Sequence, residues 1–498
     1  MSNFVTLKIN LLAPELLLFA ILVVYLLLSL VTKPSQIKKL NIFLFISLFL
    51  LGLSQLFLMK NIEPQTAMNG MYIHDSMSHL FKGFSAILLA FVFIYSYKYL
   101  KIIGISVVEF NLISLFALLG QFIIISAYHL LLVYLGIELL SLALISAVAL
   151  RRDNNISSEA AMKYFVLAAL ASGFMLYGMS MIYGTTGSLD LVTISDQIAS
   201  ETSNSLVLVF GLVFLLAGIG FKFGAVPFHM WVPDVYQGSS FSTTLLLGAA
   251  PKIAAIALLI RLLIEGLPDL ANHWEKMILL MGLLSIILGN FVAVVQSNIK
   301  RMLAYSTIGH VGFILLGFGS GLLNSNIDQA LEAYSSSIFY VLTYTITVLG
   351  VFGVLLLISK EKDDKDDIND LKGLVNKNPL AGWCMVVFMF SMAGVPPTVG
   401  FYAKFVILES LIASDYFSLV VLAALSSVVG AFYYLRIIKI IVFDDLNDNH
   451  NIFFTQRDTL FSSKLVLATN GFAIIFLGLI PGQVMTICVH AVQSSLTY

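Results

Sequence analysis

Long apolar runs separated by short polar gaps decide what this chain can fold into. Each run is about 18 to 25 residues long, the length that an α-helix needs to cross the hydrocarbon core of a bilayer. Backbone polar groups have no water to bond with in lipid, so such runs form helices. Of the 498 residues, 59% are hydrophobic and only 11% are charged. The predicted fold class is therefore an all-α polytopic membrane protein.

Fourteen runs are expected to span the membrane: 11-31, 40-59, 77-97, 108-126, 128-150, 159-183, 205-231, 242-264, 275-295, 301-319, 334-358, 381-411, 416-442 and 464-488. The first run is too long for a signal peptide and lacks a small-residue cleavage site, so we interpret it as a retained helix.

Basic residues are distributed very unequally between the two sets of alternate connecting segments. One set carries eighteen lysines and arginines, and the other carries only Lys8, Lys60 and Lys276. The positive-inside rule places the basic set in the cytoplasm and both termini on the non-cytoplasmic side. That arrangement requires an even number of spans, which agrees with fourteen. We expect a multi-pass protein of a bacterial inner membrane.

Two of the predicted spans contain proline in their middle. Pro227 lies in the seventh span, within GAVPFH, and Pro396 and Pro397 lie in the twelfth, within AGVPPT. Proline removes a backbone donor and clashes with the preceding turn, so both helices should break at membrane depth. Interrupted spans at matching positions of two halves indicate an ion or substrate site.

The two breaks suggest an internal repeat. Pro227 and Pro396 are 169 residues apart, and the same offset carries the fourth to eighth spans onto the ninth to thirteenth. Five spans is an odd number, so the copies should have opposite topology. The predicted organisation is three N-terminal helices in 1-107, repeats in 108-264 and 275-442, and a last helix in 443-498.

Four ionisable side chains fall close to the middle of predicted spans: Glu138, Lys222, Lys252 and Lys404. Each charge at a helix centre costs about 2.5 to 3.5 kcal/mol on insertion scales, so such residues usually face an internal cavity and act there. Burial disfavours a charged lysine and a nearby carboxylate favours it. Glu138 and Lys222 would therefore form a switchable pair. The structural alternative is that each lysine is merely paired.

Other ionisable residues carry weaker signals. His229 lies beside the first break and could relay protons toward the second half, together with Lys252. Lys163, nearer the cytoplasmic end of the sixth span, is either an input residue or a snorkelling side chain. For Lys82 and Arg261, near helix ends on the outer side, snorkelling is the expected explanation. We expect His129 and His310 to be core or interface histidines.

No pattern indicates redox chemistry within the chain. The two cysteines, Cys384 and Cys488, lie in separate apolar runs without a CxxC motif or a Cys/His cluster. Neither a disulfide framework nor a metal or iron-sulfur site is suggested. The sequence predicts a chain that moves protons and performs no redox step alone.

Several motifs carry a resemblance to a known family. They are LGIELL at 135–140, GFKFGAVPFHMWVPDVYQG at 220–238, APKI at 250–253, SNIKRMLAYS at 297–306 and GFYAKF at 400–405. With them the chain resembles the antiporter-like membrane subunits of respiratory complex I, the proton-translocating NADH:quinone oxidoreductase. The DVYQG ending, Pro251-Lys252 and a terminus soon after the last span favour the N-type branch. Ser239-Ser240-Phe241 departs from the family pattern, which usually has Ala-Pro after the glycine.

The resemblance implies a division of labour within a larger complex. NADH, FMN, iron-sulfur clusters and quinone would be bound by other subunits, and this chain would hold no cofactor. Its partners would be the other membrane-arm subunits, including a sister antiporter-like subunit and small membrane subunits, with the lipid bilayer and no nucleic acid. Glu138 and Lys222 would couple, Lys252 would carry protons and Lys404 would be the terminal lysine. Lys300 matches a family lysine, although cytoplasmic topology explains it equally well.

Two other functions remain open at this stage. The chain could be a subunit of a stand-alone cation/proton antiporter, which shares this fold, or a non-pumping structural spacer of the membrane arm. The N-type Pro251-Lys252 pair argues against the first alternative. The second predicts that the buried lysines can be replaced without loss of pumping.

Overall fold

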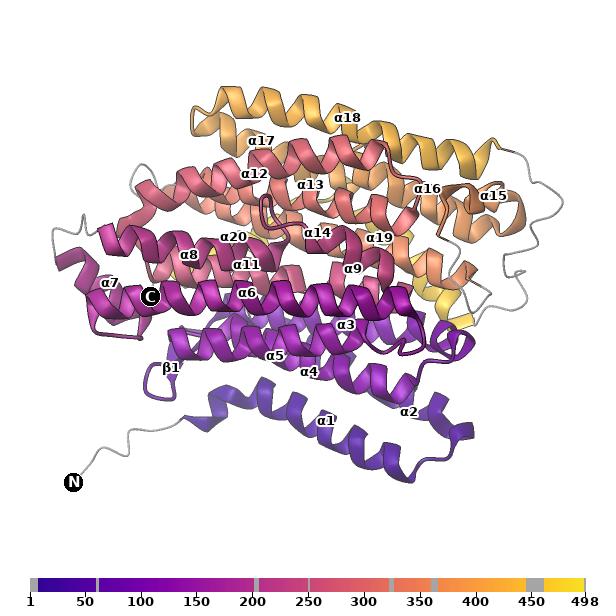
Figure 1. Ribbon diagram of the computed structural model, residues 1–498, viewed down its shortest axis with the longest axis horizontal. Coiled ribbons are helices and arrows are strands. Elements are labelled where there is room, and N and C mark those ends of the chain that lie inside the picture. The colour runs from indigo at the N-terminus through magenta and orange to yellow at the C-terminus, as the bar shows by residue number, and fades with distance from the viewer. Residues whose placement is uncertain are drawn as a thin grey trace.

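Helices that run side by side along one common direction make up the molecule (Figure 1). The computed structural model describes residues 8–59, 62–200, 206–249, 251–321, 327–359, 366–444 and 461–496. Five basic residues used in the topology argument lie outside this described part: Lys60, Lys360, Lys362, Lys365 and Arg457.

The first part of the chain forms η1 (Ile9–Leu12), α1 (Ala13–Val31), η2 (Pro34–Gln36), α2 (Ile37–Leu58), β1 (Gln65–Ala67), β2 (Tyr72–His74), α3 (Ser76–Ile103), α4 (Val107–Ser126), α5 (Leu130–Val148), α6 (Asn155–Thr186), α7 (Leu191–Ser200), α8 (Leu206–Phe223), α9 (Trp231–Gly238), α10 (Phe241–Gly248), α11 (Pro251–Leu259) and η4 (Ile260–Glu265).

The second part forms η5 (Pro268–Leu270), α12 (Ala271–Val294), α13 (Ile299–Gly319), α14 (Ile327–Ile358), η6 (Ile368–Leu371), α15 (Leu374–Lys377), α16 (Pro379–Ala393), α17 (Val399–Ala413), α18 (Phe417–Val442), α19 (Phe461–Leu479) and α20 (Gly482–Leu496).

The all-α membrane fold expected from the sequence is confirmed. Thirteen described helical segments are long and apolar enough to cross a membrane. They match thirteen of the fourteen predicted spans, and the remaining one, the twelfth, is split into α16 and α17. The apolar side chains exposed around the bundle, such as Phe57, Leu170 and Val428, suit contact with lipid.

The bundle has two distinct ends. At one, strands β1 and β2 pair antiparallel, with Gln65 opposite His74, and the start of α1 and the end of α20 lie on the same side (Figure 1). We call this the hairpin end. The opposite end carries α15, the start of α13 with Lys300 and the α5–α6 connection with Arg151, and we call it the basic end.

Both predicted breaks are present. Helix α8 ends at Phe223, and α9 begins at Trp231 after a stretch without regular helix. Helix α16 ends at Ala393, and α17 begins at Val399. Gly224 and Gly394 follow the first half-helix of each pair with φ of +76° and +85°, a conformation that favours glycine. Proline and glycine together therefore end both half-helices.

The eighth span is also interrupted, which the sequence analysis did not anticipate. Helix α10 ends at Gly248 and α11 begins at Pro251, so proline occupies the first helical position, where its missing N–H does no harm. Beyond Leu259 the span continues as a π-helix, η4. Local π-helical turns are rare and often occur at functional sites.

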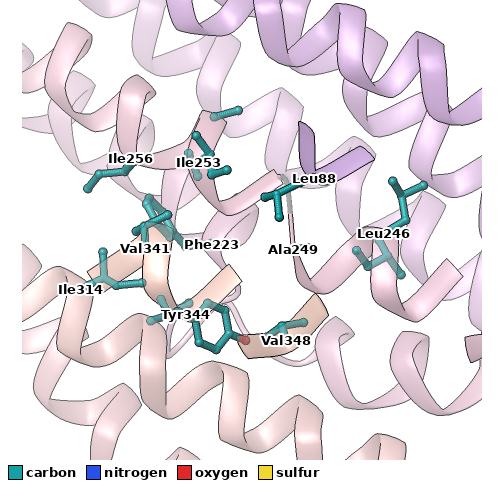
Figure 2. Close-up of a cluster of buried hydrophobic side chains, with 14 of the residues drawn as sticks. Leu88, Phe223, Leu246, Ala249, Ile253, Ile256, Ile314, Val341, Tyr344 and Val348 are labelled. Carbon is teal, nitrogen blue, oxygen red and sulfur yellow. The ribbon is translucent and has the colours of Figure 1, made fainter. Parts of the chain in front are cut away.

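The core lies where the first and second halves meet. Figure 2 shows a cluster of buried side chains that includes Phe223, Ile253, Ile314, Val341 and Tyr344, with Ala249, between α10 and α11, to one side of them. They come from α8, α11, α13 and α14. The described residues beside the interruption, Gly248, Ala249 and Pro251, are buried, as irregular backbone at membrane depth should be.

Candidate proton-transfer residues

Glu138 and Lys222 meet at the contact between α5 and α8. Lys222 Nζ donates a hydrogen bond of 2.6 Å to Ser141 Oγ, and Ser141 lies one turn after Glu138 on α5. Glu138 accepts a hydrogen bond from Ser172 of α6. Within the described residues the two charges form no direct ion pair, and Ser141 donates its own hydroxyl hydrogen to the carbonyl of Ile137. Both side chains are half-buried.

Lys222 shares a narrow cavity with Lys252. Ser141, Tyr164 and Trp231 also line it, and it offers about 30 Å³ of space for water-sized molecules. Roughly 10 to 15 Å³ of such space holds one water, so the cavity has room for about two. A polar, roomy gap between two lysines can support proton transfer through water.

Lys252 is held at the end of a half-helix. Its side chain is buried, and Nζ donates to the carbonyl oxygen of Phe223 at 3.2 Å. Nζ also lies 5.8 Å from the centre of the Trp231 ring. Phe223 is the last residue of α8, where carbonyls lack helical partners and the helix dipole is negative. An ammonium group is favoured at such a position.

Lys404 is bound in the same manner in the second half. Its Nζ donates to the carbonyl of Ala393, the last residue of α16, at 2.9 Å, and to Ser427 Oγ at 3.0 Å. It lies 5.5 Å from the centre of the Phe313 ring. Each break therefore presents a half-helix carbonyl terminus to one lysine.

A histidine and several tyrosines form a cluster within the second half, on α13, α14 and α18. His310 Nδ1 and Tyr340 Oη are 2.7 Å apart, and His310 Nε2 and Tyr434 Oη are 3.0 Å apart. The Tyr344 hydroxyl donates to Thr307 Oγ1 at 2.9 Å. His310 is buried, as expected, but it is fully engaged with hydroxyl groups. Its tyrosine partners lie on other helices, so spacing around His310 gives no sign of them.

His229 and Lys163 lie elsewhere. His229 is buried in the segment between α8 and α9, and its Nδ1 has no hydrogen-bond partner in the described part of the chain. Lys163 lies toward the basic end with 45% of its side chain exposed, paired with Glu159 at 2.9 Å and Asp234 at 3.0 Å. The described contacts link neither residue to Lys222 or Lys252.

Lys300 is buried and paired at the basic end. Its Nζ donates to the carbonyl of Ser239 at 2.9 Å and lies 2.9 Å from Asp366. The neighbouring Arg301 pairs with Asp234 at 2.7 Å. Lys300 therefore points into the protein, whereas Arg301 joins the half-exposed network around Asp234.

The expectation that Lys82 and Arg261 snorkel to the interface was wrong. Their side chains are 1% and 0% exposed. Lys82 pairs with Glu15 at 2.6 Å, and Arg261 pairs with Asp75 at 2.8 Å. Both partners come from distant parts of the chain, and an inward ion pair replaces hydration that a snorkelling side chain would otherwise need.

No group of three or more His, Cys, Asp and Glu side chains suited to a metal ion occurs within the described ranges. Cys384 and Cys488 are both free thiols.

Comparisons with known proteins place the chain in a family. Residues 127–430 match the family model described as NADH:quinone oxidoreductase/Mrp antiporter, transmembrane. A protein named NADH-quinone oxidoreductase subunit N from Herminiimonas arsenicoxydans is 48% identical over 430 residues, 86% of either chain. Its namesake from Cupriavidus taiwanensis is 46% identical over 434 residues, 87% of either chain.

Solved structures agree. A chain of respiratory complex I from Thermus thermophilus, with bound aureothin, superimposes with a TM-score of 0.78 at 31% identity and covers 95% of this chain and 98% of its own length. A chain of the Mrp complex from Dietzia sp. has a TM-score of 0.80 over 97% of this chain and 99% of its own. Its 16% identity shows the shared fold alone.

Buried lysines beside broken transmembrane helices define the class of ion-moving membrane subunits. Within that class, this chain belongs to the NADH:quinone oxidoreductase/Mrp antiporter family of membrane subunits.

Proposed function

We propose that this chain is the proton-translocating membrane subunit of an NADH:quinone oxidoreductase and that Glu138, Lys222, Lys252 and Lys404 carry its protons. Relatives of 46% to 48% identity over nearly the whole length bear the name NADH-quinone oxidoreductase subunit N. The Mrp chain reaches only 16% identity, so the oxidoreductase is favoured over a stand-alone antiporter.

The observation that carries the proposal is the shared cavity. Lys222 and Lys252 line one water-sized space, and the Lys252 ammonium rests on a helix-end carbonyl that can hold either a proton-bearing or a neutral amine. A charged lysine in such a place is stabilised by the helix terminus, and a neutral one avoids the cost of burial. Small changes in the surroundings can therefore shift its protonation.

Glu138 supplies such a change. A carboxylate close to Lys222 favours its protonated form, and moving the carboxylate away favours release of the proton into the cavity. Lys252 then accepts it. Moving one charge across the membrane costs about 2.3 kcal/mol per 100 mV, which a shift of a few pKa units supplies.

The second half continues the path. Lys404 lies at the other break, and the His310 and tyrosine cluster fills the space toward it, with about 10 Å³ of room beside Ala403. Lys163 serves as a proton entry residue at the basic end. His229 remains a candidate relay, because its Nδ1 has no hydrogen-bond partner among the described residues.

The proposed setting is the membrane arm of the complex in a bacterial inner membrane. The basic end faces the cytoplasm and the hairpin end, with both termini, faces outside, because positive residues remain in the cytoplasm. Other subunits bind NADH, FMN, iron-sulfur clusters and quinone. A sister antiporter-like subunit and small membrane subunits contact this chain.

Two inverted repeats, 108–264 and 275–442, organise the path. In support, α8 lies nearer the hairpin end than α9, whereas α16 lies nearer the basic end than α17 (Figure 1). The broken helices therefore run in opposite directions. Each repeat then contributes one helix-end lysine site.

Replacing Lys222 with Met in the assembled complex tests the proposal. Inverted membrane vesicles report quinone reduction and proton uptake together, and both should fall while the complex stays intact. The matched control is Lys439→Met on α18, whose side chain is 70% exposed and which should change neither rate. Wild-type rates of both quinone reduction and proton uptake in Lys222→Met would overturn the role of Lys222 and favour the spacer function.

A further inference from the structure

A buried ionic cluster lies at the hairpin end, apart from the four proposed carriers. We call it the hairpin-end cluster. It joins α1, the start of α3 and η4, and its charged members are Glu15, Asp75, Lys82, Arg261 and Glu265. All five side chains are 11% exposed or less. Charges buried this deeply persist only where they are paired or used.

The charges in the cluster do not balance. Three carboxylates face two cations, so one negative charge is in excess when all are ionised. Lys82 forms an ion pair with Glu15, whose other oxygen accepts a hydrogen bond from the Tyr72 hydroxyl at 2.8 Å. Arg261 forms ion pairs with two carboxylates, Asp75 and Glu265. The excess negative charge is therefore shared by Asp75 and Glu265.

Of these two carboxylates, Asp75 accepts more hydrogen bonds. Arg261 Nη2 bonds both of its oxygens at 2.8 Å, and the backbone N–H and hydroxyl of Ser78 donate to it as well. Burial raises the pKa of Asp75, but Arg261 and Ser78 outweigh burial and leave the pKa below its ordinary value. Asp75 is thus ionised near neutral pH.

Glu265 is left with an open position. Its Oε1 accepts from Arg261 Nη1 at 2.7 Å and from the Ser495 hydroxyl. Its Oε2 is buried and has no hydrogen-bond partner in the described part of the chain. A buried carboxylate oxygen without a donor is costly, and a proton on it would remove the excess charge. Glu265 is therefore the carboxyl of the cluster best suited to bind a proton.

The cluster contacts residues that are neighbours in the chain of those lining the cavity of Lys222 and Lys252. Ile124 and Leu258 line that cavity. The next residue after Ile124, Ile125, accepts a hydrogen bond from Arg261 Nε at 3.3 Å, and Ser126 Oγ accepts from Lys82 at 2.5 Å. Arg261 lies three residues after Leu258. Lys252 and Glu265 thus belong to one interrupted span that leads from the cavity to the hairpin end.

The cluster reaches toward the surface through the hairpin. The ionisable groups that face it from all packed elements are Glu15, Tyr72, His74, Asp75, His79, Lys82, Arg261 and Glu265. Burial and the nearby Lys82 lower the pKa of His74, so this half-buried histidine is neutral near neutral pH. It adds no charge that would cancel the excess.

We propose that Glu265 is the proton-release group of this chain at the hairpin end. A proton delivered by that path binds Glu265 Oε2, Arg261 and Asp75 remain an ion pair, and the proton then passes to water at the hairpin end. Glu265 returns to the carboxylate, so no other reactant is needed. This inference rests on the proposed function, because it assigns the exit of that same path.

The test uses Glu265→Gln in the assembled complex in inverted vesicles, where the hairpin end faces the lumen. Glutamine keeps the shape and the bond to Ser495 but binds no proton. We expect turnover to fall by roughly tenfold or more. This is less than the roughly 10² to 10⁴-fold rate contribution typical of a group that transfers a proton. The wild-type rate should decrease as luminal pH falls at fixed external pH, and Glu265→Gln should lose that dependence.

Two further variants keep the result decisive. Glu265→Asp retains a carboxyl and should restore turnover with a shifted luminal pH profile, and it replaces Glu265→Gln as the test if the latter fails to assemble. Glu275→Gln on α12 removes another buried carboxylate, which accepts a hydrogen bond from Tyr416, and this variant should behave as wild type.

The possible failures are distinguishable. Wild-type turnover and luminal pH profile in Glu265→Gln, or an unshifted profile in Glu265→Asp, would overturn the release role. If Lys222→Met still abolishes pumping in that case, only the exit assignment fails. If Lys222→Met also pumps normally, the proposed function fails with it.

Discussion

At both broken helices a lysine bonds the last carbonyl of the first half-helix, but the two lysines come from different parts of the chain. At the first break, the carbonyl of Phe223 is bonded by Lys252, which arrives from the next span. At the second, the carbonyl of Ala393 is bonded by Lys404, which lies later in the same broken helix. Both carbonyls directly precede a glycine with positive φ.

The equivalent positions around the breaks carry opposite charges. Ten residues after Gly224 stands Asp234, and ten residues after Gly394 stands Lys404. Asp234 holds Lys163 and Arg301 at the basic end, whereas Lys404 bonds its own half-helix. The backbone break is thus the shared feature, and the side chains that use it differ between the halves.

The largest effect should come from variants that keep the positive charge at the helix end but cannot release a proton. Lys252→Arg and Lys404→Arg keep a cation at the half-helix terminus, but arginine cannot release its proton in proteins. We expect both variants to assemble and to lose pumping, by roughly 10²-fold in turnover. Quinone reduction and proton uptake in vesicles measure this.

The matching methionine variants complete the comparison. Lys252→Met and Lys404→Met lose the cation as well. Their free energy of unfolding should therefore be lower than that of the arginine variants by about 0.3 to 1 kcal/mol. Pumping that survives in only one arginine variant would show that the two breaks are not functionally equivalent.

A middle-sized effect should come from two glycine contacts at matching places. A Cβ on Gly120 of α4 would lie 2.7 Å from the backbone nitrogen of Leu140, and a Cβ on Gly289 of α12 would lie 2.5 Å from that of Gly309. Gly120→Ala and Gly289→Ala should each destabilise the subunit by about 1 to 3 kcal/mol, because backbone must move. Thermal denaturation of the purified complex measures it.

The control for these substitutions is Gly173→Ala on α6, where an added Cβ meets nothing within 4 Å. It should leave the melting temperature unchanged or raise it slightly, since alanine is the better helix former. Equal melting temperatures for all three variants would contradict the tight packing of both helix pairs.

The smallest effect concerns the network at the basic end. Asp234→Asn removes the partner of Lys163 and Arg301, whose side chains are 45% and 30% exposed. Solvent screens ion pairs this exposed, and they contribute little to stability, so assembly should be nearly normal. If Lys163 is the entry residue, proton uptake should nevertheless slow at high external pH, and a wild-type profile would argue against that role.

Much of the fold was accessible from local sequence. The length of each apolar run predicted a spanning helix, and Pro227 and Pro396 predicted the two breaks that are present. The interruption at Pro251 was missed, because the first helical position tolerates proline and the surrounding run is uniformly apolar. The burial of Lys82 and Arg261 was missed as well, because proximity to a helix end suggested an easier route to water.

The sequence by itself determined that the chain crosses a membrane, that two of its spans break at proline and which ionisable residues fall near the middle of apolar runs, since these follow from run length and proline chemistry. Only the tertiary structure decided which lysine meets which carbonyl, that Lys222 and Lys252 share one cavity, and that Arg261 joins Asp75 to Glu265. Those contacts join residues up to 186 positions apart, and their partners are chosen by helix packing, which no local pattern specifies.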